Sequence, residues 1–143
     1  MVLQKKRIFL VEDKPQQVMV TSLYLCCEGA TVFAGWWGLD TAQAIIERLP
    51  IDLILMDLWF PGPTSGFQLL RWIKETPELA HIPVVALSAA DPNPAIPQAF
   101  EAGFSGYIGK PVSRAMVSSV AAVLAGEQVW SADQWQPWMT RTC

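Results

Sequence analysis

Acidic, hydroxyl and ammonium side chains follow four short apolar runs of this sequence. Glu12 and Asp13 come after the first run, and Asp57 ends a run of four large apolar residues. Ser88 and Lys110 follow two later runs. A lone carboxylate is costly to remove from water. An acid at the end of a buried strand, such as Asp57, is therefore either a solvated loop residue or part of a site.

Together, these side chains would supply the chemistry of phosphoryl transfer. Carboxylate oxygens suit a hard cation such as Mg²⁺, which also binds waters and a phosphate oxygen. Three acids at close range repel one another, so a bound cation would relieve their charge. Lys110 could pair with a phosphoryl group, and Ser88 could donate a hydrogen bond to it. A metal, a cation, a donor and an acceptor carboxylate are the parts that this reaction requires.

Apolar runs alternate with helical periodicities along the chain, and this pattern predicts the elements that position the site. Strands are predicted at residues 8–11, 31–34, 53–56, 83–87 and 106–108. Helices are predicted at 16–28, from 40 or 41 to 49, from 66 to about 76, within 91–102 and from 113 to 125. Alternating strands and helices indicate βα units and a parallel sheet, whose strands all end at one edge. Ligands of such sheets bind at that edge.

Two helices carry further predictions. Met19, Leu23 and Cys26 share one face of the first helix, and Gly29 is a plausible C′ residue. In the segment 91–102, three prolines are expected to leave room for only a short helix.

The chain is predicted to contain one domain, residues 1–125, followed by a Trp-rich tail, residues 126–143. A chain of 143 residues can bury a single core without disulfides. The tail has no clear periodicity and is too short to form a separate output domain. Its tryptophans and the pair Trp36-Trp37 are expected to pack together or to contact another chain.

Composition argues against several classes of function. The net charge is −3, and no basic cluster occurs beyond Lys5-Lys6-Arg7, which argues against nucleic-acid binding. No stretch approaches the roughly 18 apolar residues that insertion into a membrane requires. The three cysteines have no metal-type spacing and are interpreted as reduced thiols of a cytoplasmic protein.

In their order, the motifs of this sequence resemble those of receiver domains of two-component response regulators, the CheY-like family. The resemblance covers about residues 6–125 and rests on Glu12-Asp13, Asp57 with Pro61, Ser88-Ala89 and Lys110-Pro111. Any one of these motifs is weak evidence for the family. All four in this order, each after its own predicted strand, are specific evidence for it. The resemblance implies an α/β doubly wound fold, flavodoxin- or CheY-like, with five helices around a five-stranded parallel sheet of order 2-1-3-4-5.

The resemblance also implies a role for each site residue. Asp57 would accept a phosphoryl group from the phosphohistidine of a sensor histidine kinase or a phosphotransfer protein. Glu12, Asp13, Asp57 and the backbone carbonyl of Trp59 would hold Mg²⁺. Ser88 and Lys110 would bind the new phosphoryl group.

Three further features follow from the same resemblance. The Lys110–Pro111 bond is expected to be cis. Tyr107 matches an aromatic residue that changes rotamer as Ser88 moves, although it is also consistent with an ordinary half-buried strand aromatic. In the family, the surface of the fourth helix, fifth strand and last helix often carries dimerisation or output contacts, and the prolines of a short fourth helix argue against dimerisation there. Bulky Trp59 is expected to slow hydrolysis of the acyl phosphate.

The leading interpretation is a single-domain response regulator, not an enzyme, that binds a protein target when phosphorylated. The alternative is a pseudo-receiver that acts as a constitutive protein-interaction module. A hydrolase with Asp57 as transient nucleophile is disfavoured, because such phosphatases commonly carry a second acid where this chain has Trp59.

Overall fold

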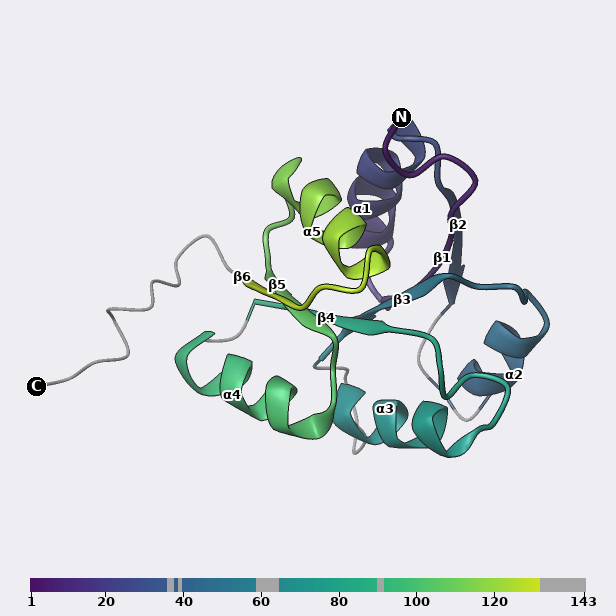
Figure 1. The fold of residues 1–143 in the computed structure, drawn as a ribbon, viewed down its shortest axis with the longest axis vertical. Coiled ribbons are helices and arrows are strands. Elements are labelled where there is room, and N and C mark those ends of the chain that lie inside the picture. The colour runs from purple at the N-terminus through teal and green to yellow at the C-terminus, as the bar shows by residue number, and fades with distance from the viewer. Residues whose placement is uncertain (36–37, 39, 59–64, 90–91, 132–143) are drawn as a thin grey trace, which may run out of the picture.

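The computed structural model describes residues 1–35, 38, 40–58, 65–89 and 92–131, and these form one parallel sheet of six strands with order β2-β1-β3-β4-β5-β6 (Figure 1). The strands are β1 (Arg7–Val11), β2 (Thr31–Gly35), β3 (Leu53–Asp57), β4 (Val84–Ser88), β5 (Gly106–Gly109) and β6 (Val129–Ser131). The helices are α1 (Pro15–Cys27), α2 (Thr41–Ile46), α3 (Gly66–Glu75), α4 (Pro92–Ala102) and α5 (Ala115–Leu124). The doubly wound fold and the order of the first five strands confirm the prediction.

Apolar side chains on both faces of the central strands build two cores. Figure 1 shows α1 and α5 on one face of the sheet and α2, α3 and α4 on the other. In β3, Ile54 and Met56 belong to the first core, under α2, α3 and α4. Leu53 and Leu55 belong to the second core, under α1 and α5. Because successive side chains of a strand point to opposite faces, an unbroken apolar run buries both faces.

The face of α1 that packs on the sheet is not the one marked by Met19, Leu23 and Cys26. Met19 is 69% exposed and Leu23 is 64% exposed, whereas Thr21 and Leu25 are buried. The buried pair Thr21 and Leu25 is four residues apart, and so is the exposed pair Met19 and Leu23. Periodicity therefore showed an amphipathic pattern but did not decide which face turns to the core.

Helix α4 is longer than predicted, with 11 residues. Two of its three prolines lie in the first turn, where backbone N–H groups have no intrahelical acceptor and proline costs little. Pro97 lies inside the helix and lacks one backbone donor, but Ile96 and Ala99 beside it are buried in the first core. The prediction of a short helix is therefore wrong, and the length of α4 gives no argument against dimerisation.

Strand β6, in the segment assigned as a tail, was not predicted. It pairs in parallel with β5, so that Val129 lies opposite Gly106 and Trp130 lies opposite Tyr107. Gly126, with φ +95, follows α5 and accommodates a backbone conformation that other residues rarely adopt. A strand of three residues is too short for its alternation to be recognised in a sequence.

No helix in the described part of the chain is long and apolar enough to cross a lipid bilayer.

Candidate functional site

Four neighbouring strands bring the predicted site residues to one edge of the sheet. Glu12 and Asp13 follow β1, Asp57 ends β3, Ser88 ends β4, and Lys110 follows β5. Because β1, β3, β4 and β5 are parallel and adjacent, their carboxyl ends meet there. We call this the carboxyl edge.

The acids at the carboxyl edge lie close together and are largely removed from solvent. Glu12, Asp13 and Asp57 each place one carboxylate oxygen within 4.8 Å of the others. Glu12 is 1% exposed and Asp57 is 5% exposed. Burial raises the pKa of Glu12; the hydrogen bond from Lys110 opposes this shift, and the charge of Asp57 adds to it. The cluster therefore concentrates negative charge in a poorly hydrated place.

Lys110 partly compensates this charge. Its Nζ donates hydrogen bonds to Glu12 Oε2 at 2.7 Å and to Asp57 Oδ2 at 2.9 Å. Burial lowers the pKa of the Lys110 ammonium, but the hydrogen bonds and charges of Glu12 and Asp57 outweigh burial and raise the pKa above its usual value. Lys110 is consequently protonated at neutral pH, and one ammonium faces three carboxylates.

Asp13 provides the observation that tests whether the cluster fits a metal ion. Its Oδ1 atom is buried and has no hydrogen-bond partner among the described residues. Leaving such an acceptor without a partner costs about 1–3 kcal/mol. Glu12 and Asp57 already accept hydrogen bonds from Lys110, so the oxygen of Asp13 adds coordination capacity beside them. An all-oxygen donor set of this charge fits a hard divalent cation such as Mg²⁺.

The other predicted residues are placed as follows. Ser88 is buried at the end of β4, 1% exposed. Tyr107 is fully buried in the first core rather than half-buried. The Lys110–Pro111 peptide bond is cis. Trp59, whose carbonyl was predicted as a metal ligand, lies outside the described residues, as does the pair Trp36-Trp37.

Gly66, which the sequence did not single out, also positions Asp57. Its backbone N–H donates to Leu58 O at 2.8 Å, so α3 begins against the backbone that directly follows the acid. A Cβ atom on residue 66 would lie 2.7 Å from Asp57 O and 2.9 Å from Leu58 Cα. The only signal in the sequence is a glycine at the start of an amphipathic helix, where a longer side chain would ordinarily be tolerated.

We expect Gly66→Ala to push α3 away from the end of β3 and to lower the free energy of unfolding by about 1–3 kcal/mol. Mg²⁺ affinity should fall as well, because the displaced backbone carries Asp57. Gly38→Ala is the matched control, since no atom of the described residues beyond its chain neighbours lies within 4 Å of a Cβ there. Urea unfolding and a Mg²⁺ titration measure both effects; equal results for the two variants would contradict the assignment.

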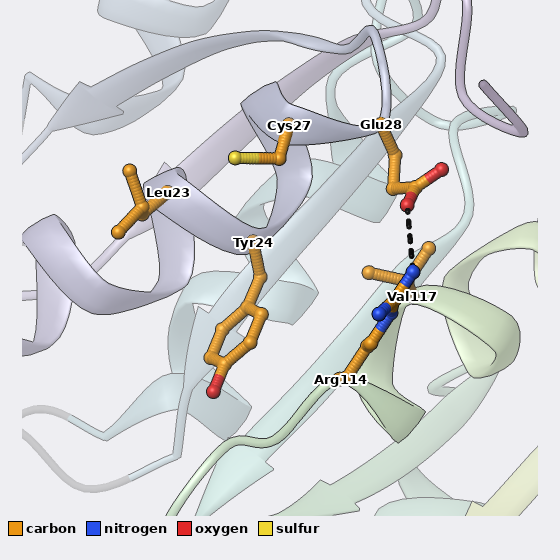
Figure 2. Close-up of a pocket in the computed structure, with 6 residues that line it drawn as sticks. All are labelled: Leu23, Tyr24, Cys27, Glu28, Arg114 and Val117. Atoms are coloured by element: carbon orange, nitrogen blue, oxygen red, sulfur yellow. Dashed lines mark ion pairs between the residues drawn. The ribbon is translucent and has the colours of Figure 1, made fainter.

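A separate pocket lies between α1 and α5 and shares no residue with the site (Figure 2). Its volume is about 380 Å³, and it is lined by Leu23, Tyr24, Cys27, Glu28, Arg114 and Val117. The one ion pair drawn there joins Arg114 Nη2 to Glu28 Oε2 at 3.9 Å, and the Arg114 side chain is 86% exposed. An exposed pair at this distance contributes little, and the lining lacks the converging polar groups of the carboxyl edge.

Comparisons with known proteins agree with this geometry. The family model described as the response regulator receiver domain matches residues 8–122. The two-component response regulator ARR3 of Arabidopsis thaliana is 35% identical over 105 residues, which cover 68% of this chain but only 45% of ARR3. The polar-differentiation response regulator DivK of Brucella ovis is 32% identical over 108 residues, or 76% of this chain and 86% of DivK.

A solved structure is similar as well. It is the receiver domain of the sensor histidine kinase PA1611 from Pseudomonas aeruginosa, which was solved with a magnesium ion coordinated in its active site cleft. The TM-score is 0.70 at 28% identity, over 85% of this chain and 98% of that domain.

Proposed function

We propose, from the premise that this chain belongs to the response regulator receiver family, that Asp57 is its phosphoacceptor. The observation that carries the proposal is the Asp57 carboxylate, bonded to Lys110 at 2.9 Å and within 4.8 Å of the oxygens of Glu12 and Asp13. The proposed phosphodonor is the phosphohistidine of a sensor histidine kinase or of a phosphotransfer protein. The proposed output is protein binding by the phosphorylated form, not turnover of another substrate.

In the proposed reaction, a carboxylate oxygen of Asp57 attacks the phosphorus atom of the donor. A P–O bond forms while the P–N bond breaks, and its electron pair returns to the imidazole nitrogen. The Lys110 ammonium, already bonded to Asp57, pairs with the transferred phosphoryl group, and the Ser88 hydroxyl donates a hydrogen bond to it. Mg²⁺, when held by Glu12, Asp13 and Asp57, supplies positive charge that stabilises the phosphoryl oxygens.

The proposal is tested with acetyl phosphate, a small phosphodonor that needs no partner protein. The protein is incubated with acetyl phosphate and Mg²⁺, and its intact mass is measured beside a sample stripped of metal with a chelator. We expect one added phosphoryl group per chain with Mg²⁺ and none without it. Failure to form an adduct, together with failure to bind Mg²⁺, would overturn the proposal and favour a constitutive interaction module.

A further inference from the structure

Strand β6 joins α4 to the edge of the sheet through an aromatic side chain. Trp130 lies opposite Tyr107 of β5 and packs against the first core, to which Tyr107 also belongs. The Trp130 ring makes an edge-to-face contact with Phe100 of α4, with centroids 5.4 Å apart and planes at 69°. We call Phe100, Tyr107 and Trp130 the aromatic bridge.

The sequence of β5 accommodates this strand. A Cβ atom on residue 106 would lie 2.8 Å from Val129 O, so only glycine lets β6 approach β5 this closely. Val129 packs toward the second core, on the face opposite Trp130. Val129 and Trp130 therefore contact opposite faces of the sheet, and each contact can be removed without the other.

The aromatic bridge connects two elements that meet the site. Helix α4 begins at Pro92, shortly after Ser88 ends β4, and β5 leads directly into Lys110. A phosphoryl group on Asp57 adds negative charge that attracts the Ser88 hydroxyl and the Lys110 ammonium. Such movement at the ends of β4 and β5 would change the position of α4 relative to β5. Phe100 is 59% exposed, so its ring lies outside the closely packed core and is able to follow a shift of α4.

We infer that the aromatic bridge is coupled to phosphorylation of Asp57: it is closed in the unphosphorylated chain and opens, with β6, in the phosphorylated one. This inference rests on the proposed function of Asp57. Coupling between two sites is reciprocal, so a substitution that opens the bridge favours the phosphorylated state. Opening of the bridge would leave β5 in place of β6 as an edge strand of the described sheet.

The first test is hydrogen–deuterium exchange of the full chain with and without Mg²⁺ and beryllofluoride, a stable mimic of the phosphoryl group. We expect backbone amides of residues 127–131 to exchange faster in the beryllofluoride state, because opening of the bridge frees β6 from β5. Unchanged exchange, in a sample shown to bind beryllofluoride, would overturn the inference.

The second test compares variants of one strand. Trp130→Ala removes the bridge, and we expect the affinity for beryllofluoride in the presence of Mg²⁺ to rise about fivefold. Val129→Ala is the matched control: it truncates the adjacent side chain of β6 on the other face and should leave this affinity unchanged. Phe100→Ala removes the same ring contact from an exposed position, so it provides the test if Trp130→Ala does not fold.

The outcomes separate this inference from the proposed function. Equal beryllofluoride affinities of Trp130→Ala, Phe100→Ala and the parent protein, all of which form the acetyl phosphate adduct, overturn the bridge but leave Asp57 as acceptor. Equal gains in affinity from Val129→Ala and Trp130→Ala also overturn it, because general loosening of β6 would then explain the effect. The absence of an adduct in every variant overturns the proposed function and the inference together.

Discussion

Asp57→Asn is expected to abolish phosphorylation by acetyl phosphate in a chain that still unfolds cooperatively. An amide oxygen does not act as a nucleophile toward phosphorus, whereas the volume of the side chain and a hydrogen-bond acceptor for Lys110 are kept. Lys110 also keeps its second partner, Glu12 Oε2 at 2.7 Å. Intact mass after incubation with Mg²⁺ and acetyl phosphate measures the adduct, and circular dichroism during urea unfolding measures the fold.

Asp52→Asn is the matched control for this substitution. Asp52 precedes β3, at the opposite end of the strand from Asp57, and its Oδ2 accepts a hydrogen bond from the Arg7 backbone N–H at 2.8 Å. We expect this variant to lose some stability but to be phosphorylated. An adduct on Asp57→Asn, or its loss from a folded Asp52→Asn, would show that another residue is the acceptor.

Lys110→Met is expected to destabilise the metal-free protein by about 3 kcal/mol, since removing one partner of a buried ion pair leaves uncompensated charge. The Lys110 side chain is 10% exposed, and its ammonium bridges Glu12 and Asp57. Without it, three carboxylates face one another. Mg²⁺ should restore much of the lost stability, because a divalent cation supplies the missing positive charge.

Urea unfolding with and without Mg²⁺ measures both parts of this prediction. The stabilisation by Mg²⁺ should be larger for Lys110→Met than for the parent protein. Lys14→Met is the control, since Lys14 is exposed and its hydrogen bond to Glu12, at 3.3 Å from Oε1, is donated by the backbone N–H rather than by the side chain. Equal losses in the two variants, or equal stabilisation by Mg²⁺, would show that Lys110 does not neutralise the acids.

The positions of the candidate site residues could be predicted from the sequence because these residues carry a local signal. Asp57 directly follows an apolar run, and so does Glu12, so the end of each of these two strands is marked by an acid. The right-handed connection of parallel strands then brings these ends to one edge without any knowledge of side-chain contacts. The grouping of Glu12, Asp13, Asp57 and Lys110 needed only this rule.

The features that the sequence did not reveal depend on contacts between distant segments. Gly66 matters because the backbone of residues 57 and 58 lies against it. The short strand β6 depends on Gly106, which leaves space for the backbone of Val129, and on the ring contact between Trp130 and Phe100 of α4. The orientation of α1 was equally ambiguous, since Leu23 and Leu25 fit alternative stripes with the same period. The local pattern of apolar residues does not determine which distant segment of the chain a helix face or strand will contact.

The buried strand β3 also shows how the sheet avoids a wrong alignment. Its residues are apolar on both faces, so sliding β3 by one position would still bury apolar groups and carry little penalty in the cores. Met56 now lies opposite Val11. A slip that moved Asp57 into that place would turn its carboxylate into one of the two apolar cores, away from Lys110, at the cost of an unpaired buried charge. The acid proposed to accept phosphate therefore also specifies the register of the central strand, and an alignment error would be rejected during folding.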